Sequence, residues 1–379
     1  MGAFLDTPEG VDIVSVDPSN REEVGRVRAS TPAEVRAAVE RARAAQASWG
    51  ALPARDRSRR LGAFRDAVRD HAEELSELLS RECGKTRFEA LVQEVVSVTD
   101  LMSYFIDRGP EILAPKKLPL HLLKHRASYL HRAPRGVVGV ISPWNYPLAI
   151  GAGGIFMALV AGNGVVHKPS ELTPLVADRT RALFIEAGLP GDLLQVVHGR
   201  GDVGQALVDG GVDFVHFTGS TAVGRKIGAA CGERLIPCAL ELGGKAPAIV
   251  CADADPDRTA QALVWGAFAN QGQVCASVER VYVHATLYDE LVGKIVERTK
   301  QLRLGDPRQP EVDVGVMTSE RQVEIVEARV KDATERGARI EVGGARRPGG
   351  LGFAPTVLTA CTQDMDVMRR RSSARSCRS

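Results

Sequence analysis

One cysteine of this sequence has surroundings that suit a nucleophile. Cys275 lies in the segment 270–277, where small neighbours leave its thiol approachable. A thiolate is a strong nucleophile and forms covalent intermediates with electrophilic carbon. Cys238 and Cys251 lie in apolar, strand-like stretches, where we expect inert core thiols. Residue types alone do not decide between these thiols, so the choice stays open at this point.

A second candidate for chemistry is Glu241, which stands between Leu240 and Leu242 and is followed by Gly243 and Gly244. Leucine neighbours predict a partly desolvated carboxylate. Desolvation raises the pKa of a carboxyl group and makes it a better general base near neutral pH. The two glycines allow a ligand or another backbone segment to approach closely.

Two glycine-containing turns are candidate phosphate sites. The segment 199–204 fits G-x-G-x-x-G between a predicted strand and helix, but the next strand ends in 217–220 without an acid for a ribose. Tight turns also favour glycine for backbone reasons alone. The segment 219–224 likewise opens a helix, whose free N–H groups attract phosphate. Ser220 adds a hydroxyl there, although a plain N-cap role also fits it. We favour the second turn.

Lys168 and Glu171 follow another predicted strand. A lysine beside an acid at a strand end can bind ribose hydroxyls from both sides. The carboxylate would repel a 2′-phosphate, which favours NAD over NADP. A pair of this kind is also typical of a solvated surface.

Four short apolar strands alternate with helices after residue 136. We predict strands at 137–141, 164–167, 193–197 and 212–217, with helices from 147, over 177–187, over 203–207 and after 220. This alternation is typical of βαβ units and a parallel sheet. Ligands bind at the carboxyl ends of such strands, where all the polar turns above lie.

Two amphipathic helices precede this region. The first begins at a capping box, Thr31 to Glu34, with proline at its first position. The second carries Leu61, Phe64, Val68, Leu75 and Leu79. Both are expected to pack in a core, and residues 116–135 alternate in polarity like a surface hairpin.

Composition excludes several classes of protein. The 379 residues are 44% hydrophobic and 25% charged, as in a soluble globular protein of two or three domains. A net charge of +2 argues against nucleic acid or an anionic membrane as the main partner. Seven cysteines without C-x-x-C argue against a disulfide framework and a zinc site, and His167, His198 and His216 lack metal-ligand spacing. We therefore predict no metal.

The N-terminal sequence has no basic and apolar signal regions, so we expect a cytoplasmic protein. Residues 136–167 carry no Asp, Glu, Lys or Arg, but prolines at 143 and 147 and glycines at 162 and 164 interrupt them. We expect a buried strand, turn and helix there, and no membrane span.

Five segments in this order resemble the aldehyde dehydrogenase superfamily. They are Ile141–Pro147, Lys168–Glu171, Phe217–Gly224, Leu240–Lys245 and Gln271–Cys275, and Glu82–Lys85 is similar too. The resemblance runs from about residue 10 to Met368. It implies an α/β fold: a Rossmann-like parallel-sheet cofactor domain (1–115 and 136–242), an oligomerisation hairpin (116–135) and an incomplete α/β catalytic domain (243–368).

The resemblance implies a reaction in which Cys275 attacks an aldehyde to give a thiohemiacetal. Hydride transfer to NAD would leave a thioester, while Asn145 and the Cys275 N–H would hold the oxyanion. Glu241 would activate the water that releases the acid, which speaks against the coenzyme-A-acylating members. Trp265 and Phe268 would line the aldehyde channel or pack in the core.

The implied cofactor is NAD in preference to NADP. Lys168 and Glu171 would bind the adenosine ribose and Ser220 the pyrophosphate. The other implied cofactor contacts are Ile141, Ser142, Pro143, Trp144, Gly204, Phe217, Thr218, Gly219, Val223, Leu242 and Gly243. The implied partners are a small-molecule aldehyde and further copies of the chain.

The end of the chain departs from the family pattern. After residues 364–368 the family continues with an acid-rich run and Glu-x-Phe-Gly-Pro, whose glutamate grips the nicotinamide ribose. Here residues 369–379 contain five arginines, four serines and no acid. Such a run does not form a core strand. We expect truncation or a shifted reading frame after about Met368, with a natural basic tail as the alternative.

Such a truncation would remove the last strand of the oligomerisation sheet and leave an open edge on the hairpin, which impairs assembly. Two other functions stay open. One is a catalytically impaired dinucleotide-binding remnant. The other is ester or thioester hydrolysis by Cys275 and Glu241 without NAD.

Overall fold

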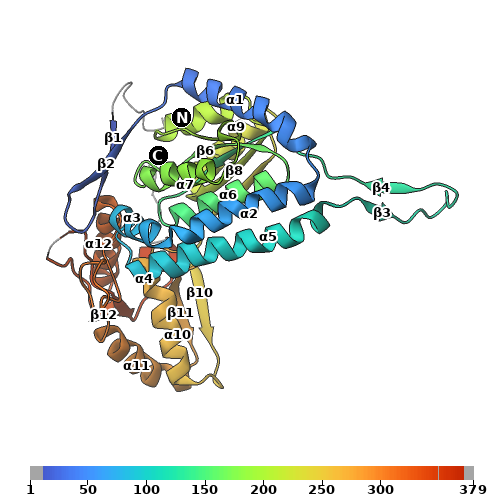
Figure 1. Cartoon of the computed structure of the whole chain (residues 1–379). Helices are drawn as coiled ribbons and strands as arrows, with labels where there is room; N and C mark the ends of the chain where they lie inside the picture. The colour runs from blue at the N-terminus through green and yellow to red at the C-terminus, as the bar shows by residue number, and fades with distance from the viewer. Residues whose placement is uncertain (1–11, 349, 371–379) are drawn as a thin grey trace.

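A parallel sheet forms the centre of the larger lobe in the computed structural model, which describes residues 12–348 and 350–370 (Figure 1). Its five strands lie in the order β7-β6-β5-β8-β9. They are β5 (Val137–Ile141), β6 (Gly164–Lys168), β7 (Leu194–Val196), β8 (Phe214–Gly219) and β9 (Cys238–Leu242). The predicted α/β fold class and the alternation of strands with helices are confirmed.

Helices cover both faces of this sheet because its central strands are apolar on both faces. Alternate residues of one strand enter different cores: Val138 and Val140 pack with one cluster, and Val137 and Ile141 with the other. The first face carries α2 (Ala54–Asp70), α5 (Ser97–Leu113), α6 (Pro147–Val160) and α7 (Pro174–Glu186). The second carries α1 (Pro32–Ala51), α8 (Gly201–Asp209) and α9 (Thr221–Glu233).

The predicted second amphipathic helix is two helices. The chain breaks at His71, between α2 and α3 (Ala72–Cys83), where the His71 N–H closes the last turn of α2 on Ala67 O. Then follow α4 (Arg87–Glu89) and a π-helical stretch, η1 (Ala90–Val96), that leads into α5. The predicted capping box is confirmed, since Thr31 and Glu34 cap α1 reciprocally.

Two antiparallel hairpins lie outside the sheet. One pairs β1 (Asp12–Val16) with β2 (Glu23–Arg28). The other pairs β3 (Lys116–Leu118) with β4 (Ser128–Leu130) and projects far from the rest of the molecule (Figure 1). The predicted surface hairpin over 116–135 is therefore present. No helix in the described ranges is long and apolar enough to span a membrane.

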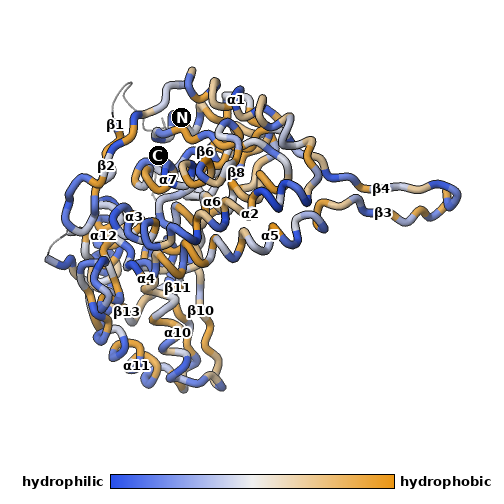
Figure 2. The backbone as a smooth tube through the Cα atoms, in the orientation of Figure 1, coloured by the Kyte–Doolittle hydropathy of each residue, from blue (hydrophilic) through white to orange (hydrophobic). Residues whose placement is uncertain are grey.

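The smaller lobe holds two short sheets. Parallel strands β10 (Ala246–Val250) and β11 (Val278–Val283) pack with α10 (Pro256–Phe268) and α11 (Tyr288–Lys300). Strands β12 (Arg339–Val342) and β13 (Val357–Thr359) are antiparallel and accompany α12 (Glu320–Glu335) and α13 (Asp366–Arg369). Short 3₁₀ turns lie at Gly191–Leu193 (η2), Ala269–Gly272 (η3) and Ala285–Leu287 (η4). Hydrophobic stretches run along both lobes (Figure 2).

Arg369 closes α13, so the expected anomalous tail of 369–379 begins inside a helix. The rest of that tail, residues 371–379, lies outside the described residues.

Candidate active site

Cys275 follows a turn with an uncommon backbone conformation. Asn270 (φ 50°, ψ 39°) and Gln271 (φ 55°, ψ 32°) are both left-handed, and Gly272 (φ 72°) continues the turn. A left-handed residue other than glycine costs roughly 1–3 kcal/mol and persists only where its surroundings hold it. Here the Asn270 N–H donates to Glu89 Oε1 at 2.6 Å. The turn leaves the Cys275 side chain exposed.

Asn145 lies against this loop. Its Nδ2 donates to the carbonyl of Gln273, two residues before Cys275, at 2.8 Å. The Asn145 carbonyl in turn accepts from Asn270 Nδ2 at 3.0 Å. A side-chain amide carries two N–H donors, and one of them remains for a further acceptor beside the loop. Asn145, which lies between β5 and α6, is thus hydrogen-bonded to the loop that carries Cys275.

A buried ion pair that was not predicted from the sequence contacts the backbone carbonyl of Asn145. Lys85 Nζ donates to Glu94 Oε1 at 2.5 Å and to the Asn145 carbonyl at 2.8 Å, and both side chains of the pair are fully buried. Glu94 Oε2 accepts the first free N–H groups of α6, from Leu148 at 3.0 Å and Ala149 at 2.8 Å. Burial raises the pKa of Glu94, and the Lys85 charge opposes this rise.

Glu241 is exposed, so the expectation of a desolvated carboxylate is wrong. Side chains alternate along a strand, and the flanking Leu240 and Leu242 both face α9, where they meet Gly228 and Gly224. Glu241 therefore points to the other face of β9, which is the edge strand of the sheet. Its leucine neighbours in sequence do not surround it in space.

Most of the predicted cofactor residues lie at the carboxyl ends of the strands of the sheet. The ends of neighbouring strands are in register, with Ile141 opposite both Lys168 and Phe217, and Gly219 opposite Leu242. Ser142, Pro143 and Trp144 follow Ile141 directly, and Thr218, Ser220 and Gly243 adjoin the other strand ends.

The two glycine turns differ in what they do structurally. Ser220 Oγ accepts the Val223 N–H at 3.3 Å as the N-cap of α9, so the cap role is confirmed. Gly224 packs closely on the Leu242 side chain, which would have to move to accommodate a Cβ at residue 224 because the two would lie 2.5 Å apart. The other turn opens α8, and a Cβ on Gly204 would lie 3.9 Å from the Lys168 side chain, so this turn borders the end of β6, whereas Gly224 borders the end of β9.

Lys168 is buried at the end of β6, and its Nζ donates to the Pro169 carbonyl at 3.0 Å. Glu171 is half-buried. The interpretation of this pair as a solvated surface pair does not fit the lysine.

His167, on β6, is hydrogen-bonded to Ser142 after β5, and its shifted pKa makes the stability of the fold depend on pH. Its Nε2 lies 2.8 Å from Ser142 Oγ, and its Nδ1 is buried without a partner in the described residues. Burial, together with the charges of His198 and Lys168, lowers the pKa of His167 from 6.5 to about 3. The folded protein therefore keeps this imidazole neutral well below neutral pH.

We expect His167 to lower the stability of the protein as the pH falls below about 6.5, while Glu82, whose pKa burial raises to about 7, acts in the opposite direction. In that range the unfolded chain binds a proton at residue 167 that the folded chain does not, at a cost approaching about 1.4 kcal/mol per pH unit. Urea unfolding at pH 7.5, 6 and 5 measures this slope. His167→Gln removes the contribution of His167, so this variant should lose less stability on acidification than the unaltered chain, and equal slopes in both proteins would contradict this expectation.

The exposure of the remaining cysteines differs from the prediction. Cys251 is exposed, so its assignment to a core is wrong, and Cys238 is half-buried. Cys83 and Cys231 are the buried thiols, and burial raises the pKa of Cys231 to about 11. No group of His, Cys, Asp and Glu within the described ranges is arranged to hold a metal ion.

Of the two residues expected at an aldehyde channel or in the core, Trp265 is 69% exposed and so is not in the core. Phe268 lines a mainly apolar cavity of about 610 Å³. This cavity also borders Gln271 and Gly272 of the turn before Cys275, and extends between β11 and β13.

A parallel sheet covered by helices, and an exposed cysteine on a loop that is bonded to Asn145 after β5, define an α/β protein with a candidate thiol site. Residues 5–371 match the sequence profile of the Aldehyde dehydrogenase family, and the chain belongs to that family.

Two curated relatives illustrate the match. A Mycolicibacterium smegmatis protein named "Putative succinate-semialdehyde dehydrogenase", with NADP(+) in its name, is 39% identical over 92% of this chain and 68% of its own length. The "4,4'-diapolycopene aldehyde oxidase" of Methylomonas sp is 38% identical over 95% of this chain and 68% of its own length. The chain thus spans about two thirds of these relatives.

Solved structures agree with the fold. A Bacillus cereus aldehyde dehydrogenase in complex with NAD+ superposes with a TM-score of 0.92 at 30% identity, covering 96% of this chain and 74% of that chain. An E. coli structure described as an NADP dependent enzyme gives 0.93 at 32% identity, covering 98% and 78%.

Proposed function

We propose that this chain oxidises an aldehyde to a carboxylic acid and transfers the hydride to a nicotinamide dinucleotide. The observation that carries the proposal is the exposed Cys275 on its left-handed turn, joined to Asn145. The Cys275 thiolate adds to the aldehyde carbon, and the carbonyl electron pair moves to oxygen. The free N–H of Asn145 and the Cys275 backbone N–H hold that oxyanion.

A nicotinamide dinucleotide held at the strand ends, by residues that include Lys168 and Ser220, would supply the hydride acceptor, and an acyl group would then remain on the Cys275 sulfur. Glu241, exposed to water, takes a proton from the water molecule that attacks this thioester. The carbon–sulfur bond breaks, the acid leaves, and the thiolate returns. Each step uses a group at the strand ends or on the turn.

The experiment is a spectroscopic assay of the purified chain. NAD or NADP and a panel of aliphatic, aromatic and dicarboxylic semialdehydes should yield the reduced dinucleotide and equal amounts of acid. A folded chain that binds dinucleotide but gives neither product would favour a dinucleotide-binding protein without turnover. Ester hydrolysis that is unaffected by Lys168→Ala would instead favour hydrolysis without a dinucleotide.

We further propose that Lys168 and Glu171 bind the adenosine ribose, and that NAD is preferred to NADP. The names and titles of similar proteins include both NAD and NADP, and therefore do not indicate which cofactor this chain uses. The preference proposed here is based on the negative charge of Glu171. A carboxylate beside the 2′ position repels a phosphate there.

Replacing Glu171 by glutamine should therefore shift the ratio of kcat/KM for NADP over NAD by about tenfold towards NADP, about 1.4 kcal/mol. The same ratio measured for Glu335→Gln, an exposed acid on α12, is the control. An unchanged ratio in Glu171→Gln would show that this carboxylate does not face the 2′ position.

We also propose a cytoplasmic homo-oligomer that uses the projecting β3–β4 hairpin. Leu118, Leu122, Leu123, Tyr129 and Leu130 are exposed on it, and large apolar side chains gathered in this way are typical of an interface. Light scattering of the chain, with and without Tyr129→Lys, tests this assembly.

A further inference from the structure

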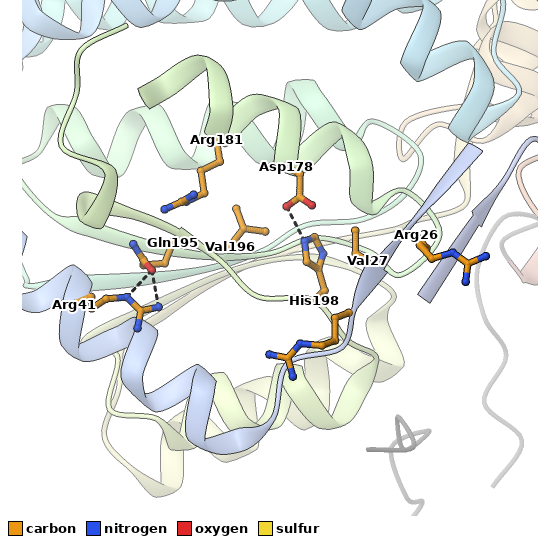
Figure 3. A pocket seen from close by; sticks show the side chains of 9 residues that line it. Arg26, Val27, Arg41, Asp178, Arg181, Gln195, Val196 and His198 are labelled. Atoms are coloured by element: carbon orange, nitrogen blue, oxygen red, sulfur yellow. Dashed lines mark hydrogen bonds and ion pairs between the residues drawn. The ribbon is translucent and has the colours of Figure 1, made fainter. Parts of the chain in front are cut away.

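A pocket of about 400 Å³ lies at the outer edge of β7, which is an edge strand of the central sheet (Figure 3). The elements around it are β2, α1, α7 and β7. Its lining is rich in positive charge, with four arginines and one carboxylate: Arg26, Arg28, Arg41, Arg181 and Asp178, together with Val27, Gln195, Val196 and His198. None of these residues has a role in the proposed reaction.

Two of the arginines are already neutralised by nearby acids. Arg26 pairs with Glu23 at 2.8 Å, and Arg28 pairs with Glu34. The single lining carboxylate, Asp178, is engaged by His198, whose Nε2 lies 2.7 Å from it. The two arginine pairs therefore contribute little net charge to the pocket, whereas Asp178 keeps its negative charge wherever His198 is neutral.

Arg41 is bound by a neutral group instead. Its Nε and Nη2 both donate to Gln195 Oε1, at 3.0 and 2.8 Å, and the nearest carboxylate, on Asp192, is 4.0 Å away (Figure 3). The Arg41 Nη1 group has no partner in the described residues. Its charge is thus only weakly compensated.

Arg181 has no carboxylate within ion-pair distance in the described chain. It donates to the carbonyl groups of Leu194 at 2.9 Å and Gly191 at 3.3 Å, and its Nη1 makes no bond there. Gln195 Nε2 donates to the same Gly191 carbonyl at 3.1 Å. The buried amide of Gln195 therefore connects Arg41 with the Gly191 carbonyl to which Arg181 also donates.

Two further polar groups line the pocket, the imidazole of His198 and the backbone of Val196. His198 is 8% exposed, and its Nδ1 is buried and unbonded in the described residues. The backbone of Val196 faces away from β6, because the neighbouring Val197 N–H is the one that bonds to His167 O. The donors that the pocket offers are therefore the remaining N–H groups of Arg41 and Arg181, since His198 Nε2 donates to Asp178 and the Nδ1 of the neutral ring is an acceptor.

We propose that this pocket binds a phosphate group, either as inorganic phosphate or as a small phosphomonoester, between Arg41 and Arg181. Planar guanidinium groups match the oxygen geometry of phosphate and form short, charge-assisted hydrogen bonds. The volume exceeds that of phosphate alone, so a small organic substituent fits beside it.

The test is calorimetric titration of the full chain with inorganic phosphate and with glycerol 1-phosphate. Saturating NAD is present so that the dinucleotide site is filled. One site per chain is expected, and Arg41→Gln and Arg181→Gln should each weaken binding by about tenfold or more. Arg59→Gln, which removes an exposed arginine of α2, is the matched control and should bind like the unaltered chain.

Tighter binding of glycerol 1-phosphate than of inorganic phosphate would identify a phosphomonoester site, and the reverse would identify inorganic phosphate. Unchanged affinity in both pocket variants would overturn the proposal, as would complete displacement of phosphate by NAD. Neither measurement depends on turnover, so the proposal stands or falls separately from the proposed aldehyde oxidation.

Discussion

Replacing Cys275 by serine will lower aldehyde-dependent formation of reduced dinucleotide by at least about 10³-fold. The hydroxyl of serine is a far weaker nucleophile than a thiolate. Loss of the group that forms the covalent intermediate typically removes most of the rate enhancement. The assay is steady-state production of NADH by equal amounts of both proteins.

The fold and the dinucleotide site should be unaffected by this change, because the Cys275 side chain is exposed and touches no core. Circular dichroism and the dissociation constant for NAD should match those of the unaltered chain. Cys251→Ser, at the other exposed thiol of the smaller lobe, is the control and should retain activity. Equal activity of Cys275→Ser and the unaltered chain would exclude Cys275 as the nucleophile.

The second large effect is expected at the buried ion pair. Lys85→Met will destabilise the protein by about 3–5 kcal/mol, because it leaves the Glu94 carboxylate buried without its counter-charge. Denaturant unfolding measures this cost. Lys331→Met, at an exposed pair with Glu335, should cost less than about 1 kcal/mol.

Two properties separate this role from ordinary core packing. Changing Glu94 as well, in Lys85→Met/Glu94→Gln, removes the unpaired charge and should recover part of the lost stability. The Asn145 carbonyl still lacks its lysine donor in that variant. We therefore expect kcat to remain low while the KM for NAD changes little. Full recovery of kcat would show that the pair stabilises the fold only.

Local patterns were sufficient to predict four of the five strands of the central sheet, all except β9. The strands from β5 to β8 are short apolar runs between turn residues, and their helices follow at the expected spacing. The break at His71 could not be predicted in this way, because Val68 and Leu75 are seven residues apart and stay in phase across it. Both helices then bury the same face that one helix would bury.

The candidate site was predicted less completely, because its residues depend on contacts that are distant in sequence. Glu241 was expected to be desolvated from its leucine neighbours, yet alternation on an edge strand exposes it. Lys85 lies nine residues from Glu94, and no periodic pattern indicates that α6 and Asn145 close around the pair. Charged residues in a sequence are ordinarily read as surface.

The central claim is that aldehyde oxidation proceeds through an acyl group on Cys275. Intact-mass and peptide-mass spectrometry of Glu241→Gln, incubated with an accepted aldehyde and NAD, tests it most directly, since this variant should form the thioester but hydrolyse it slowly. We predict a mass increase equal to the aldehyde less two hydrogens, located on the peptide that contains Cys275 and dependent on NAD. Reduced dinucleotide formed without any adduct on Cys275, or an adduct on another residue, would contradict the account.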